Sequence, residues 1–185
     1  MIKINGNTLS LEEIIQVSRS NEKVILDSSC FPIINKSAHQ VQRILHGNKP
    51  VYGINTGFGV FSNKSISIED SLKLNRNLIL SHAIGCGVPL PREVIRAAIL
   101  IRANTLAKGF SGARLIIMET LISMLNTDLT PLVKSQGSLG SSGDLCMLSQ
   151  LALVFTKDKK DLEQESGNAW LKHELLSGKT AMQNA

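Results

Sequence analysis

Apolar residues recur every three or four positions along much of the chain, which is the pattern of amphipathic helices. The first such stretch carries Leu11, Ile14 and Val17. It begins directly after Ser10 and contains Glu13, and the side chains of these two residues can each bond the other's free backbone N–H as a capping box. The pattern therefore predicts a helix that begins directly after Ser10.

Five further helices are expected from the same spacing and from signals at their ends. Gly47 and Gly109 are typical stop residues, Pro91 is tolerated at a helix start, and Ser111 and Asp144 are candidate N-caps. The expected ranges are about 37–46, 67–84, 91–109, 111–130 and 144–155. Strand signals are weak and fall only on 24–26 and 50–54. One mainly α domain with minor β, spanning 1–185, is the prediction.

Composition restricts the class of protein. The chain of 185 residues is 43% hydrophobic and 19% charged, which favours a packed globular domain over disorder. Aromatic residues make up only 4%, too few for a base-stacking platform. The net charge is +5, but the basic residues are scattered, so neither nucleic acid nor a membrane surface is indicated as a partner.

Cysteine and histidine spacing argue against metal and disulfide frameworks. Cys30, Cys86 and Cys146 are odd in number and far apart. The four histidines contain no i, i+4 pair that would suggest a metal site. No stretch resembles a signal peptide or reaches the length of a membrane span. We therefore expect a cytoplasmic protein with reduced thiols and no bound metal.

The segment 52–59, YGINTGFG, is the first that suggests chemistry. Three glycines in seven residues allow backbone conformations that other residues avoid. Tyr52 at the mouth of such a loop can present its hydroxyl to a ligand. A plain turn with a packed tyrosine is the alternative.

The segment 137–145, GSLGSSGDL, is the second. One interpretation is a flexible loop that leads into a helix capped by Asp144. The other is chemical: the Gly143 nitrogen attacks the Ser141 carbonyl carbon with loss of water, and Ser142 then loses its hydroxyl as a second water. The product would be an electrophilic ring, made from the chain itself, that carries an exocyclic alkene.

These two segments, in this order, resemble the ammonia-lyases and aminomutases that use a methylideneimidazolone (MIO) group. The resemblance includes 77–83, NLILSHA, and 102–114, RANTLAKGFSGAR, and runs from about Leu9 to Phe155. It implies the N-terminal part of the MIO-type, L-aspartase/fumarase-like helical fold. It also implies a homotetramer with active sites built from several subunits.

The resemblance assigns roles to individual residues. Ser141, Ser142 and Gly143 would form the MIO group without an external cofactor, and Tyr52 would be the catalytic base. His82 would contact the substrate side chain, although a satisfied core histidine is the alternative. The pair Ser81–His82 is similar to that of members acting on L-histidine, which yield trans-urocanate and ammonia.

The sequence departs from the family pattern beside the electrophile. Ser141 stands where the family usually has alanine, and 146–150, CMLSQ, replaces a common Ala-Pro-Leu-Ala-His. Family members are also more than twice as long, so a truncated chain, inactive alone, is expected. The alternatives are an aromatic amino acid aminomutase, another aromatic ammonia-lyase, and an inactive truncated or partner-assembled relative.

Overall fold

The computed structural model describes residues 1–47, 49–138, 145–156 and 162–185. The helices are α1 (Leu11–Ser20), α2 (Phe31–Leu45), α3 (Ile68–His82), α4 (Arg92–Ala107), α5 (Leu115–Asn126), α6 (Leu145–Leu153) and α7 (Gly178–Asn184). The strands are β1 (Ile2–Ile4), β2 (Val24–Leu26), β3 (Cys86–Pro89), β4 (Leu129–Pro131), β5 (Lys134–Gln136), β6 (Asn168–Leu171) and β7 (Glu174–Ser177). The mainly helical prediction is confirmed.

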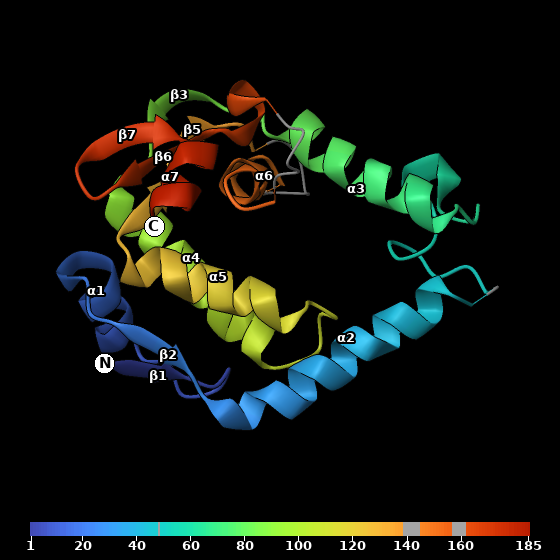
Figure 1. Ribbon diagram of the computed structural model, residues 1–185, viewed down its shortest axis with the longest axis horizontal. Helices are drawn as coiled ribbons and strands as arrows, with labels where there is room; N and C mark the ends of the chain where they lie inside the picture. The colour runs from blue at the N-terminus through green and yellow to red at the C-terminus, as the bar shows by residue number, and fades with distance from the viewer. Residues whose placement is uncertain (48, 139–144, 157–161) are drawn as a thin grey trace.

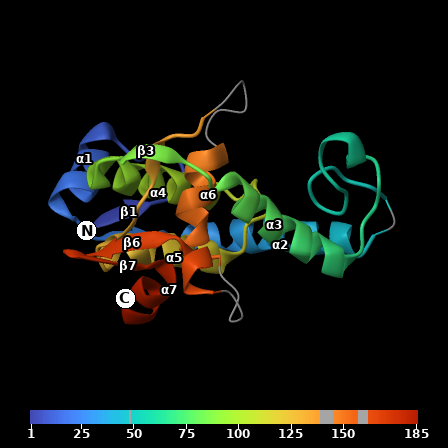
Figure 2. The same cartoon turned by 90° about the horizontal axis from the view of Figure 1, so that it is seen from above.

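The chain forms a body from which a long arm projects. In the body, α4 packs against α5 and α1 (Figure 1). β4 packs against α5 and α4, and α7 packs on β4 and β6. The arm consists of α2, the connecting loop and α3, and it extends well beyond the body in Figure 2. The C-terminal part of α3 returns to the body, where α3 contacts α6.

Three small sheets complete the body. β1 and β2 pair in parallel, β3 and β5 pair antiparallel, and β4, β6 and β7 form an antiparallel sheet with β6 in the centre. β6 and β7 form a hairpin whose turn places Lys172 at φ 54°. Among these strands, only β2 falls on a segment for which the sequence predicted a strand.

The core lies mainly between α4, α5 and the strands beside them. Its largest fully buried side chains are aliphatic or methionine: Ile4, Ile34, Ile99, Leu100, Met118, Leu121, Met124, Leu125, Leu129, Val17, Val133 and Val154. Burial of this apolar surface is the main favourable term in folding. In the described part of the chain, no helix is long and apolar enough to cross a membrane.

The predicted helix starts at Ser10, Ser67 and Pro91 are confirmed. Ser10 Oγ accepts the Glu13 amide at 3.2 Å, and Glu13 accepts the Ser10 amide at 2.9 Å, which completes the capping box. Ser67 Oγ accepts the Asp70 amide at 3.0 Å. Pro91 occupies the N-cap of α4. These local hydrogen bonds explain why residue type alone locates these ends.

The predicted start of the second helix is wrong. α2 begins at Phe31 rather than Ser37, because Pro32 is accommodated in its first turn. A 3-10 helix, Ser28–Cys30, leads into it and is capped by Asp27. The Ser29 amide hydrogen bond and the nearby Lys3 lower the pKa of Asp27 to about 2.

The predicted cap at Ser111 is also wrong. α5 begins at Leu115 with Arg114 in the N-cap position. Before it, Gly109 and Gly112 both adopt left-handed φ angles, of 71° and 70°. The Gly112 amide donates to Ser37 Oγ at 2.9 Å, so the chain turns toward α2 instead of entering a helix.

The strand expected over 50–54 is absent, and these residues form a turn instead. Asn55, which is 4% exposed, directs this turn. Its Oδ1 accepts the Val51 amide at 2.7 Å, and its Nδ2 donates to the carbonyls of Ile44 and Lys49. The end of α2 is thereby joined to the loop that carries Tyr52.

Candidate functional site

Tyr52 lies in the loop at the outer end of the arm. Its side chain is 64% exposed, and its ring meets Phe58 edge-on with centroids 6.0 Å apart. The hydroxyl of an exposed tyrosine is available to a ligand or to a neighbouring chain. The interpretation as a simple packed tyrosine is therefore less favoured than sequence alone suggested.

The loop is fastened to the N-terminal half of α3. The Ile54 carbonyl accepts Ser71 Oγ at 3.3 Å, and the Asn55 carbonyl accepts the Ile66 amide at 3.0 Å. Sequence reasoning missed Asn55, whose position inside a glycine-rich segment was its only signal. The polar residues Asn55 and Ser71 thus fix the place from which Tyr52 projects.

His82 lies at the opposite end of α3, and its ring orientation is defined. Nδ1 lies 2.8 Å from the Leu78 carbonyl and 3.1 Å from Ser81 Oγ. Because a carbonyl oxygen only accepts hydrogen bonds, Nδ1 must carry the proton. Within the described part of the chain, no partner engages Nε2. His82 therefore presents a hydrogen-bond acceptor when its imidazole is neutral.

The candidate electrophile residues Ser141, Ser142 and Gly143 lie outside the described residues. Their flanks are described, and these converge on the end of α3. A Cβ added at Gly137 would lie 2.2 Å from Cys146 Sγ and 3.3 Å from Gly85 Cα. The strand before the segment, the helix after it and the turn that follows His82 are therefore in direct contact.

Tyr52 and His82 are not brought together within one chain. Ser71, which holds the Tyr52 loop, and His82 are 11 positions apart on α3. At about 1.5 Å per residue, that separation is roughly 16 Å along the helix axis. The Tyr52 loop and His82 therefore lie at opposite ends of α3.

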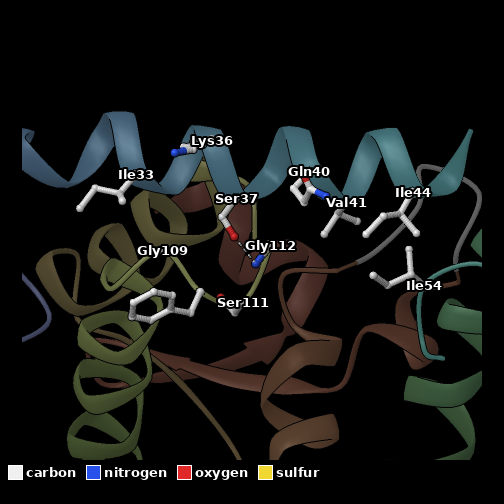
Figure 3. A pocket seen from close by; sticks show the side chains of 11 residues that line it. Ile33, Lys36, Ser37, Gln40, Val41, Ile44, Ile54, Gly109, Ser111 and Gly112 are labelled. Carbon is white, nitrogen blue, oxygen red and sulfur yellow. Dashed lines mark hydrogen bonds between the residues drawn. The ribbon is translucent and has the colours of Figure 1, made fainter. Parts of the chain in front are cut away.

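A groove of about 510 Å³ lies between α2 and the 109–112 turn (Figure 3). Its lining is mostly apolar, with Ile33, Val41 and Ile44 on α2 and Ile54 across from them. Lys36 is the ionisable residue of this lining, and neither Tyr52 nor His82 belongs to it. The groove therefore lacks the convergent acids and bases of a catalytic cleft.

Within the described ranges, the thiols and the acidic groups provide no alternative centre. Cys30 and Cys146 are buried and Cys86 is exposed, and all three are free. Burial raises the pKa of the Cys30 thiol, which makes it a poor nucleophile. Among the described residues, no group of three or more His, Cys, Asp or Glu side chains is placed to hold a metal ion.

Comparison with known proteins identifies the family of this chain. The model of the aromatic amino acid lyases matches residues 9–185. This chain belongs to the aromatic amino acid lyase family. The match extends past the segment 9–155 on which the four motifs lie and includes the β6–β7 hairpin and α7.

Relatives of this lyase chain agree with the assignment. It is 44% identical over 184 residues to a histidine ammonia-lyase of Caldanaerobacter subterraneus, covering all of this chain and 35% of that relative. An ergothioneine-degrading enzyme of Treponema denticola, 27% identical, superposes with a TM-score of 0.89 over 99% of this chain. Histidine ammonia-lyase of Trypanosoma cruzi, 25% identical, gives 0.85 over 99%. The chain covers 35% and 34% of these two structures, so it spans about a third of its relatives' length.

Proposed function

We propose that this chain provides the N-terminal portion of a histidine ammonia-lyase, which eliminates ammonia from L-histidine to give trans-urocanate. The observation that carries the proposal is the state of His82. Its Nδ1–H is committed to the Leu78 carbonyl, so Nε2 can accept a hydrogen bond from the N–H of a substrate imidazole. The 44% identity to a histidine ammonia-lyase supports the same substrate.

The proposed prosthetic group is MIO, formed from Ser141, Ser142 and Gly143 with loss of two waters and without an external cofactor. This proposal is supported by the close contact of the two described flanks: Gly137 lies so near Cys146 that a Cβ at position 137 would have no space. When present, such a group supplies an electrophilic carbon that makes the substrate amine a better leaving group.

The chain's own residues then have distinct tasks. His82 binds and orients the substrate ring through Nε2. The Tyr52 oxygen takes the proton from the carbon next to the one that bears the carboxylate. The carbon–carbon double bond forms as the carbon–nitrogen bond breaks, and the nitrogen leaves as ammonia.

The proposed assembly is a homotetramer with composite sites. It is supported by the roughly 16 Å along α3 that separates the Tyr52 loop from His82. In such an assembly, Tyr52 of one subunit would meet His82 of another. We further propose a cytoplasmic location, which is compatible with the three free cysteines.

A chimera tests the proposal. This chain replaces the matching 184 residues of the Caldanaerobacter enzyme, to which it is 44% identical. We expect urocanate and ammonia in equal amounts and a protein mass lower than the translated sequence by two waters. Tyr52→Phe in the chimera should abolish turnover while leaving the two-water deficit. A folded chimera that retains its full mass and produces no urocanate contradicts the proposal and favours an inactive relative.

An aminomutase is the second candidate. Tyrosine aminomutase of Streptomyces globisporus, 28% identical, superposes with a TM-score of 0.85 over 99% of this chain and 33% of its own. The products distinguish the two reactions, because an aminomutase returns the nitrogen to the β-carbon. A β-amino acid in place of free ammonia would favour it.

A further inference from the structure

Gln150 is a buried polar side chain in an otherwise mainly apolar helix. It lies on α6 and is 8% exposed. Its Oε1 accepts the Lys134 amide of β5 at 2.9 Å. Its Nε2 lies 3.3 Å from Cys146 Sγ and 3.5 Å from the Cys146 carbonyl. One amide group thus connects the strand before the 139–144 segment with the first turn of the helix after it.

The same side chain contacts the turn that follows α3. A Cβ added at Gly85 would lie 2.2 Å from Gln150 Nε2 and 2.9 Å from Cδ. Gly85 comes three positions after His82 and directly before β3, which pairs with β5. The Gln150 amide therefore packs where the end of α3, β5 and α6 meet.

This arrangement is specific to an amide. A buried polar group is tolerated only where its hydrogen-bonding capacity is met, and glutamine offers an acceptor and a donor in one plane. Glutamate keeps the acceptor for Lys134 but loses the donor, whereas leucine loses both. Removing the acceptor leaves the partly buried Lys134 amide without its side-chain partner.

We propose that Gln150 is a positioning residue that clamps β5 and α6, the described flanks of the 139–144 segment, to the turn after His82. The inference rests on the proposed function, because it gives the clamp its purpose: to fix the flanks between which the ring would form. The clamp itself is a contact among described residues, and it can be measured whether or not the ring forms.

The first measurement is amide hydrogen exchange by NMR on the 185-residue chain. Gln150→Leu should accelerate exchange at Lys134 by about tenfold, since the hydrogen bond that protects this partly buried amide is lost. The amide of Ile99 in the core reports global stability and should change much less. Gln42→Leu, at an exposed position on α2, is the matched control and should leave Lys134 unchanged. Equal exchange at Lys134 in wild type and Gln150→Leu would overturn the clamp.

The second measurement separates positioning from simple packing. In the chimera described above, intact mass should show the two-water deficit for wild type and a full-mass fraction for Gln150→Leu. Gln150→His, which retains an acceptor and a donor, should restore the deficit. Complete water loss in a folded Gln150→Leu variant would overturn the positioning role. A wild-type chimera at full mass would overturn the proposed function instead. In that case the hydrogen-exchange rate at Lys134 would still show whether Gln150 holds β5 against α6.

Discussion

Replacing Arg96 with methionine should remove much of the stability of the body. Arg96 is 2% exposed. Its guanidinium donates to the Val17 carbonyl at 2.9 and 3.3 Å, to the Leu125 carbonyl at 3.3 Å and to Asp128 Oδ1 at 3.2 Å. The Val17 carbonyl lies in the last turn of α1 and has no backbone donor among the described residues, because the Asn21 amide bonds to the Gln16 carbonyl instead. The Leu125 carbonyl, in the last turn of α5, also accepts the Asp128 amide at 3.4 Å. One side chain thus closes two helix ends.

The magnitude follows from what the substitution leaves behind. Burial lowers the pKa of Arg96, while Asp128 acts in the opposite direction and favours the charged form. Methionine fills similar space but leaves the buried Val17 carbonyl without a donor, at about 1–3 kcal/mol. Asp128 is 25% exposed and keeps Arg92 as its partner, so the lost ion pair adds about 1 kcal/mol or less. Arg96→Met should therefore remove about 2–4 kcal/mol, a large share of the about 5–15 kcal/mol of a typical domain.

Urea unfolding followed by far-ultraviolet circular dichroism measures the effect. We expect the free energy of unfolding to fall by about 2–4 kcal/mol, while the slope of that free energy against urea concentration stays unchanged. Arg92→Met is the control, because Arg92 also pairs with Asp128 but is 33% exposed, and it should cost about 1 kcal/mol or less. A loss below about 1 kcal/mol for Arg96→Met would refute the argument that this buried guanidinium holds the helix ends.

Three further outcomes follow from the structure. Gly112→Ala should lower the free energy of unfolding by at least about 2 kcal/mol, because the Gly112 φ is 70° and the new Cβ would clash with Val41 of α2. Gly59→Ala is the control: its φ is 57°, but its Cβ would meet no atom within 4 Å, so it should cost less. The pKa of Asp27 is lowered from 3.8 to about 2, so the stability that this carboxylate contributes is complete above about pH 4 and is lost as the pH falls toward 2. When the free energy of unfolding is measured against pH, Asp27→Asn should not show this loss. A maleimide should label Cys86 rapidly and Cys30 only on unfolding, as mass spectrometry of digested protein would show; similar rates would contradict the assigned burial.

Helix ends that depend on neighbouring residues were predictable, whereas those that depend on distant contacts were not. Ser10 and Ser67 cap helices through partners three positions away. Ser111 has the same residue type, but a contact between Gly112 and Ser37, 75 positions apart, turns the chain elsewhere. Sequence spacing carries no information about such a contact.

The strands illustrate the same limit. β3 and β5 are three or four residues long, and their pairing joins Cys86 with Gln136, 50 positions apart. Segments this short have no periodicity to recognise, and they become strands because the helices bring them together. β2 was recognisable only because its three residues, Val24–Leu26, are all aliphatic and two of them are β-branched.

The candidate site shows a division that the sequence could not reveal. Motif order placed Tyr52, His82 and the 141–143 segment on one list of functional residues, without regard to distance. In the fold, the arm extends away from the body, while α3 runs back from it to contact α6 (Figure 2). Within one chain, the exposed Tyr52 and the junction where the turn after His82 meets the flanks of the 139–144 segment are therefore separate. Under the proposed function, a complete site would form where the arm of one subunit reaches the junction of another. Such an assembly would give a purpose to an arm that contributes little to the core of its own chain.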